Sequence, residues 1–349
     1  MSDASGIEVL DEGLSRIART GPEFGGGLSN HAPMASEALV RLGRSDAVEH
    51  WLDDYLRRLD EAPTASDPVT AQTWRDALGQ MRRVADWEVY FRDQMAEEPW
   101  RDVLARWWPR LLPGVAAAAT HGVIRTSHAA RSLSQTDTAE RRDELARGLA
   151  YWAASYLELP GSARTAGDLD LAAALGALPV APEGAGQGLI TENLKAGLAS
   201  QPGFIFAVNS LREPVDAVAD LGDLAREFTR VFLRYGRERP IALLHAVTAP
   251  VAARSVLSLL PVEQARPTYD ALWQVGAALY AVYTGGVAAE PLPSSAPPDR
   301  DSVTEQAVAT GDEHAIKLTE ACLRLYSESP DPVLLHAAAR ASELLAVRG

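Results

Sequence analysis

The sequence predicts an all-α protein, built as a single helical-bundle domain over residues 1–349, and three observations support this prediction. Apolar residues recur at helical spacing in nearly every segment of the chain. Proline and glycine stand where these segments would begin or end, as Pro99 and Gly43 do. No segment shows the alternation of apolar and polar residues that is typical of a strand, and we find no internal repeat.

The expected helices follow one another along the chain and are separated by short breaks, of which Pro113 is one. The predicted helices span residues 7–18, 30–42, 47–60, 69–83, 84–97, 100–112, 115–133, 138–157, 204–208 (with a short strand as the alternative), 213–235, 240–260, 265–283, 302–327 (with Gly311 as a candidate break) and 332–347. Residues 159–202 are less regular and predict only short helical pieces. Residues 285–300 are rich in proline, alanine and serine and predict a long loop.

Composition excludes several classes of protein. The net charge of −14 argues against a nucleic-acid partner, which needs a basic face, and against an anionic membrane surface. The first residues are polar and acidic rather than a leader, and no apolar run approaches the roughly 18 residues that a transmembrane helix needs. The single cysteine, Cys322, excludes an intrachain disulfide and a cysteine-cluster metal site. We therefore expect a cytoplasmic protein without nucleic-acid or membrane partners, and leave a homodimer open.

Lysine is almost absent from this chain. Of its 33 basic residues only Lys195 and Lys317 are lysines. Arginine stays protonated under ordinary conditions, whereas lysine can lose its proton and react at nitrogen. A chain that otherwise uses arginine has little reason to place a lysine for surface charge alone, so both lysines are candidates for chemistry.

Several histidines come from apolar or small-residue surroundings on four helices far apart in the sequence. They are His31, His121, His128, His245 and His314. Lys317 follows His314 by three residues and shares its helix face. Histidines that point inward from several helices are how bundle cores hold a metal, and imidazole suits iron, copper, nickel or zinc. The alternative is a set of unrelated structural histidines, each hydrogen-bonded to a carbonyl.

Other candidate motifs favour ordinary structural roles. His50 lies among charged residues and is expected at the surface, whereas His336 is expected in the core or at an interface. The glycine-rich run 184–188 has no preceding strand and predicts a loop rather than a dinucleotide site. We expect Lys195 at the surface. We expect the tryptophans of the segment 100–108 in the core or at an interface.

Four short segments, taken together and in their order along the chain, resemble those of a known protein family. They are Asn30-His31, residues 121–125, residues 244–248 and residues 312–317. Through them the sequence resembles the questin oxidase-like family over about residues 28–340. The resemblance implies a non-haem iron oxygenase that oxidises an aromatic polyketide, or another quinone or phenol, with O2. The chemistry implied is of the Baeyer–Villiger or ring-cleaving type.

The resemblance also implies a mononuclear Fe(II) cofactor and its ligands. These ligands would be His31, His121, His245, His314 and Lys317. Lys317 would be carboxylated at its amine. Burial beside a dication lowers the pKa of a lysine, and the neutral amine can then add CO2 to form an anionic oxygen ligand. The alternative is a surface Lys317 paired with Glu313 or Glu320.

Two residues near the second motif are candidates for catalysis. Family members carry additional histidines near the first two motifs, where this chain has Met34 and Arg125, and His128 is present instead. Arg125 could hold a phenolate or carbonyl oxygen, and its alternative is an interhelical salt bridge. His128 could relay protons or replace a ligand.

The acidic residues before His314 have two interpretations, and two further functions stay open. Asp312 and Glu313 could accept from imidazole N–H groups, or they could cap the last but one helix. Instead of an oxygenase, the chain could be a metal-free helical carrier of a hydrophobic biosynthetic intermediate, or an NADPH-dependent oxidase. NADPH is also a candidate electron donor for the iron enzyme.

Overall fold

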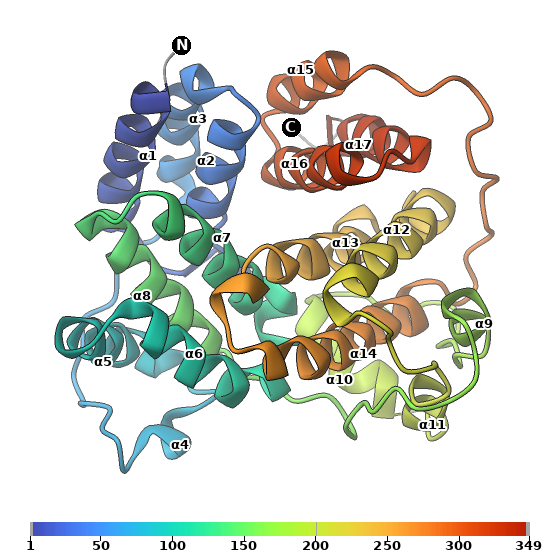
Figure 1. The fold of residues 1–349 in the computed structure, drawn as a ribbon, viewed down its shortest axis with the longest axis horizontal. Helices are drawn as coiled ribbons and strands as arrows, with labels where there is room; N and C mark the ends of the chain where they lie inside the picture. Colours follow the sequence, from blue (N-terminus) through green and yellow to red (C-terminus); the bar gives the residue numbers. More distant parts are fainter. Residues whose placement is uncertain (1–2, 200, 347–349) are drawn as a thin grey trace. The chain divides into compact units, whose positions relative to one another are not determined.

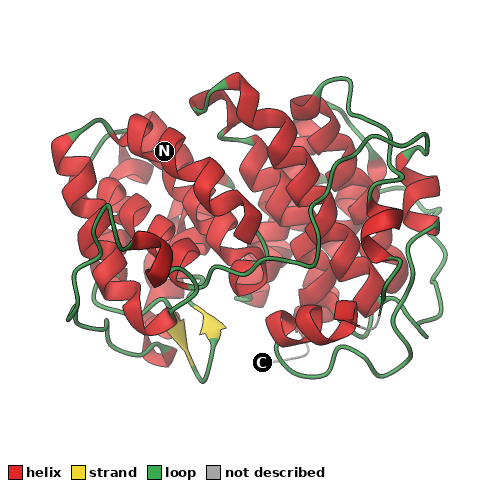
Figure 2. Cartoon of the chain, turned by 90° about the horizontal axis from the view of Figure 1, so that it is seen from below, coloured by secondary structure: helices red, strands yellow, loops and turns green. Residues whose placement is uncertain are grey.

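A computed structural model describes residues 3–199 and 201–346, and within them the regular structure is almost entirely helical (Figures 1 and 2). The predicted all-α class is therefore confirmed. The chain forms two compact units. The N-terminal unit comprises residues 1–157 and 258–260, and the C-terminal unit comprises residues 158–257 and 261–349.

Helices α1 to α8 belong to the N-terminal unit. Their bounds are α1 Asp3–Ile17, α2 Ala32–Arg41, α3 Val48–Tyr55, α4 Trp74–Ala77, α5 Val84–Glu97, α6 Trp100–Leu111, α7 His121–Gln135 and α8 Ala139–Ala154. α8 packs against both α5 and α7, and α7 also packs against α2. The core between them is aromatic, with Trp87, Trp107, Trp108 and Trp152 fully buried. Trp100 is 5% exposed, so the tryptophans of segment 100–108 lie in the core as predicted.

Two predictions fail in this unit: that no segment forms a strand, and that residues 69–83 form one helix. The glycine run after α1 forms the turn of a small hairpin, in which β1 (Glu23–Phe24) pairs antiparallel with β2 (Leu28–Ser29). Residues 69–83 form only the short helix α4 and one 3₁₀ turn instead of a long amphipathic helix. Gly79 explains the break, because its φ is +68° and its N–H donates to the carbonyl of Ala153 at 2.9 Å. A glycine in this conformation ends a right-handed helix.

The alanine-rich helix predicted over residues 115–133 is also wrong at its beginning. α7 begins only at His121, because Ala118, Ala119 and Thr120 have φ values of 45°, 55° and 74°. These three residues form a left-handed turn. Alanine favours right-handed helix, so nothing in the composition of the segment indicates this turn.

Helices α9 to α17 belong to the C-terminal unit. Their bounds are α9 Leu171–Gly176, α10 Ile190–Ala199, α11 Phe204–Val208, α12 Ala217–Tyr235, α13 Pro240–Arg254, α14 Ala265–Tyr283, α15 Arg300–Thr310, α16 Glu313–Glu328 and α17 Pro332–Leu345. α9 and α10 are the short helical pieces predicted within residues 159–202, and the loop 285–299 lies where it was predicted. Gly311, with φ of +64°, separates α15 from α16.

α13 is the central apolar helix of the C-terminal unit and packs against α12, α14 and α16. By length and composition alone the segment Pro240–Leu259 could cross a membrane, so the prediction that no apolar run is long enough is wrong. In the structure 78% of this apolar window is buried inside the protein. Other parts of the protein therefore cover most of this helix.

Candidate functional site

Two predicted ligands, His31 and His121, lie side by side in the N-terminal unit. Their rings are 4.5 Å apart between centroids, at an angle of 63°, and the residues are 4% and 5% exposed. His31 stands just before α2, where its backbone N–H donates to the Tyr55 hydroxyl at 3.0 Å. Asn30 fixes the entry to the helix, because its Oδ1 accepts from the N–H of Ala32. Together, these contacts fix the backbone on which the His31 ring is carried.

The His121 ring is oriented by its own chain. Its Nδ1 lies 2.5 Å from the carbonyl oxygen of Ala118, which can only accept a hydrogen bond. Nδ1 therefore carries the proton, and the lone pair of the neutral ring is on Nε2. A backbone carbonyl that fixes the tautomer in this way is typical of metal-ligating histidines.

The other three predicted ligands lie together in the C-terminal unit. His245 on α13 and His314 on α16 have ring centroids 5.8 Å apart, and Lys317 follows one turn after His314. His245 is fully buried, and its Nδ1 donates to the carbonyl of Ile241 at 2.5 Å. Burial holds the pKa of His245 well below its usual range, and the charges of His314 and Lys317 lower it further. This imidazole is therefore neutral at physiological pH, with its lone pair on Nε2.

Lys317 is a buried lysine, not a surface one. Its residue is 2% exposed, which excludes the surface alternative. Burial lowers the pKa of Lys317 to about 8, although Glu313 and Asp312 act in the opposite direction. A minor fraction of its amine is thus neutral near physiological pH, far more than for an ordinary lysine. Lys195, in contrast, lies exposed on α10, as predicted.

Asp312 takes the structural role that was one of its two interpretations. It is the N-cap of α16, and its Oδ1 accepts from the backbone N–H groups of His314 and Ala315 at 2.8 and 3.1 Å. The same oxygen lies 3.4 Å from Nδ1 of His314, and a Glu313 carboxylate oxygen lies 4.0 Å from that nitrogen. The cap therefore places carboxylates beside the His314 ring without excluding the second role.

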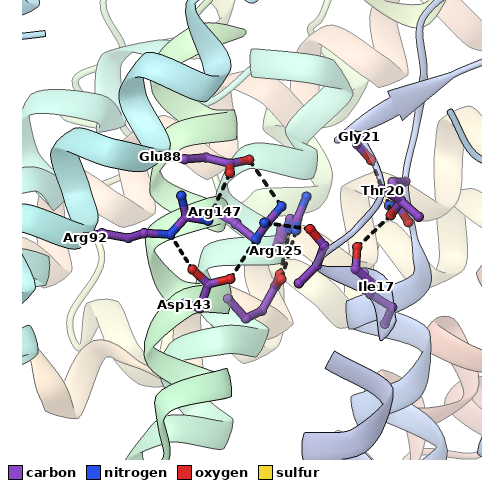
Figure 3. A network of polar contacts seen from close by, with 11 residues as sticks. Ile17, Thr20, Gly21, Glu88, Arg92, Arg125, Asp143 and Arg147 are labelled. Atoms are coloured by element: carbon purple, nitrogen blue, oxygen red, sulfur yellow. Dashed lines mark hydrogen bonds and ion pairs between the residues drawn. The ribbon is translucent and has the colours of Figure 1, made fainter. Parts of the chain in front are cut away.

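Arg125 forms an interhelical ion pair. On α7, it donates through Nε and Nη2 to the two carboxylate oxygens of Glu144 on α8, at 2.6 and 2.8 Å. Both side chains are buried. Figure 3 shows Arg125 next to a second network, in which Arg147 contacts Glu88 and Asp143. A direct role of Arg125 toward substrate stays a prediction.

His128 is part of a buried cluster two turns along α7 from His121. Its Nδ1 donates to Oε2 of Glu37 at 2.9 Å, and Arg131 contacts both oxygens of the same carboxylate. Burial would raise the pKa of Glu37, but Arg131 and His128 hold it well below its usual range. A cavity of about 10 Å³, roughly the space for one water, borders Glu37, Arg125 and His128.

The exposure of the two remaining histidines agrees with the sequence prediction fully for one and partly for the other. His50 is exposed, as predicted, and His336 on α17 is half-buried. Sequence reasoning missed Glu37 and Glu144, which hold the two candidate catalytic residues. A glutamate within the apolar and small residues of α2 was an available signal, because such a glutamate needs a buried cationic partner.

The structure thus brings the predicted ligands into two groups, one in each unit. His31 and His121 form the first, and His245, His314 and Lys317 form the second. That one ion binds all five stays a prediction. When the chain is compared with known proteins, no family model and no curated protein matches it. The fold and these two groups define the class of the chain as an all-α protein with buried histidine and lysine side chains that could bind a metal.

Proposed function

We propose that the chain is a metal-dependent oxygenase of the questin oxidase-like kind. In this proposal non-haem Fe(II) is the cofactor, and O2 oxidises an aromatic polyketide or another quinone or phenol in the cytoplasm. The ligands proposed are those of the sequence analysis. Bound iron would supply the one-electron chemistry toward O2 that amino-acid side chains lack.

The observation that carries this proposal is the burial of Lys317 beside His314 and His245. A lysine enclosed in a helical core costs free energy, and its charge has no advantage there over an apolar side chain. Its reactive property is an amine that deprotonates near neutral pH. Two imidazoles beside it supply the nitrogen donors that first-row transition metals prefer.

The donor set fits a metal in a second respect. Both His121 and His245 donate from Nδ1 to a backbone carbonyl, so both have their lone pair on Nε2. A backbone carbonyl that holds Nδ1–H fixes the ring and directs the metal-binding lone pair to Nε2, as is common among metal-ligating histidines.

The proposed oxygen ligand needs one covalent step, which balances with CO2 alone. The lone pair of the neutral Lys317 amine attacks the carbon of CO2, and a C–N bond forms. The nitrogen then loses one proton to solvent, which leaves an anionic carbamate. No oxidant or reductant takes part.

Metal content of untagged protein after anaerobic reconstitution with Fe(II) tests the proposal. We expect stoichiometric iron in the parent chain and strong losses in His245→Ala and Lys317→Arg. His50→Ala is the matched control, because that histidine is exposed and should leave the iron content unchanged. A parent chain that retains only trace iron would refute the proposal. Binding of an aromatic ligand by such metal-free protein would then favour the carrier function.

Labelling with ¹³C-bicarbonate tests the lysine step separately. We expect a carbamate ¹³C resonance in metal-loaded parent protein and in Lys195→Met, whose lysine is exposed. The resonance should be absent from Lys317→Met. A resonance that persists in Lys317→Met, or that disappears in Lys195→Met, would show that the carbamate is not on Lys317.

A further inference from the structure

The segment before α7 has a backbone conformation that its residues disfavour. Ala118, Ala119 and Thr120 are consecutive and all left-handed, with φ values of 45°, 55° and 74°. For residues with a Cβ atom the left-handed helix brings that atom too close to the following carbonyl oxygen. Glycine adopts this region without the clash, yet none of the three is glycine. A sequence that keeps alanine and threonine here retains strain that a glycine would relieve.

Trp152 on α8 holds the segment on both sides. Its indole N–H donates to the carbonyl of Gly114 at 3.1 Å, before the turn. After the turn, α7 approaches the same residue so closely that a Cβ on Gly122 would meet indole carbons at 2.8 Å and the Trp152 Cα at 2.9 Å. Trp152 is fully buried. Strained backbone persists only where its surroundings fix it, and one rigid side chain does so here.

The turn directs one carbonyl at one imidazole. The residue that follows it is His121, whose Nδ1 donates back to the carbonyl of Ala118, the first residue of the turn. This hydrogen bond makes Nε2 the lone-pair nitrogen. The strained segment therefore ends on a predicted metal ligand and determines the tautomer of that ligand.

We propose that the left-handed turn 118–120, held by Trp152, is a positioning device that fixes the tautomer and orientation of His121. The inference rests on the proposed function only for the role of this orientation, which is to present His121 to a metal. The orientation itself is already present in the metal-free protein. Ala118 and Trp152 are then positioning residues. Neither contributes a ligand.

Two variants with opposite effects on stability separate positioning from folding. Ala119→Gly relieves strain and leaves the turn favoured, so we expect a higher melting temperature with the His121 tautomer unchanged. Trp152→Phe keeps a ring against Gly122 but removes the indole N–H, so we expect a lower melting temperature and a less restrained His121. Ala130→Gly in the buried middle of α7 is the control, and should lower the melting temperature without affecting His121.

The readout is the pair of imidazole ¹⁵N shifts of His121 in metal-free protein at a pH where the ring is neutral. We expect one tautomer in the parent and in Ala119→Gly, and a mixture in Trp152→Phe. If Trp152→Phe keeps the parent tautomer, or if Ala119→Gly lowers the melting temperature, the inference is wrong. Affinity for Co(II) provides a second readout, and should fall about tenfold or more in Trp152→Phe, as it does when a partner that orients a ligand is lost. A parent that binds no metal would refute the proposed function, while the ¹⁵N shifts would still decide this inference.

Discussion

Replacing Lys317 by methionine should stabilise the metal-free protein. The side chain is buried in α16, and burial lowers its pKa from an ordinary 10.5 to about 8. Each pKa unit corresponds to ~1.4 kcal/mol, so the difference amounts to about 3 kcal/mol by which the folded state disfavours the charged amine. Methionine has a similar length and carries no charge. The variant Lys317→Met should therefore gain up to about 3 kcal/mol in free energy of unfolding at pH 7.

The pH dependence of this gain follows from the direction of the shift. At pH 7 the lysine is mostly protonated in both states, so the parent bears nearly the full cost of the buried charge. Between pH 8 and 10.5 the folded state has released its proton while the unfolded state still binds one, so the parent becomes more stable as the pH rises. The difference between parent and variant should thus shrink across this window. Burial also raises the pKa values of Tyr151 and Cys322, but both chains share these groups and their effects cancel.

Urea unfolding of metal-stripped protein in CO2-free buffer, at several pH values from 7 to 10.5, measures this difference. Lys195→Met is the control, because an exposed lysine should change stability by less than about 0.5 kcal/mol. Two results would refute the reasoning: Lys317→Met that is no more stable than the parent at pH 7, or a gain that stays constant as the pH rises. Admitting bicarbonate should stabilise the parent and leave Lys317→Met unchanged, since only the parent has an amine at this buried position, where CO2 binding favours the folded state.

Two buried ion pairs in the N-terminal unit give further predictions. Glu37→Gln should cost about 3–5 kcal/mol in urea unfolding near pH 7, because Arg131 and His128 lose their carboxylate partner. Since the pKa of Glu37 is lowered, the parent should lose this advantage as the pH falls below 4.5, and the two chains should become alike in acid; a gap that widens in acid would contradict this. Arg125→Met should cost a similar amount, about 3–5 kcal/mol, whereas adding Glu144→Leu should restore much of it, because no unpaired charge then remains buried. Additive costs in that double-mutant cycle would show that the two charges do not interact.

The long helices could be predicted because their apolar periodicity and their stop signals agree. α12, α14 and α17 begin and end within a few residues of the predicted positions. The exceptions are segments where a contact distant in sequence determines the backbone. Residues 69–83 have helical periodicity, but the N–H of Gly79 is bound by the carbonyl of Ala153, far along the chain. Periodicity within a segment carries no information about such a contact.

The start of α7 shows the same limit more sharply. Every local preference of its alanines favours a right-handed helix, and the structure has a left-handed turn there. The cause is Trp152, which binds the chain before the turn and packs against Gly122 after it. The sequence shows a glycine at position 122 but not what packs against it. Only the structure shows that Trp152 of α8 lies there, so that the missing side chain of Gly122 permits close packing of α7 and α8.

The candidate ligands could be chosen from the sequence, but their grouping could not. Apolar surroundings distinguished His245 from the exposed His50, because a polar ring in such a stretch needs a specific partner. Which histidines meet depends on helix packing, as α13 against α16 shows for His245 and His314. The ion pairs of Arg125 and His128 depend on packing in the same way. Their partners lie 19 and 91 residues away in sequence.

The scarcity of lysine was informative only in combination with position. By composition alone Lys195 and Lys317 are equivalent, yet one is exposed on α10 and the other is buried in α16. What separated them in the sequence was the neighbour of Lys317, a histidine one turn earlier on the same face. Burial then changes the chemistry of the lysine as well as its location, because the lowered pKa makes its amine a nucleophile near neutral pH. An arginine at the same position would keep its charge and could not react. A lysine is therefore needed here only if its amine nitrogen takes part in chemistry, such as the addition of CO2.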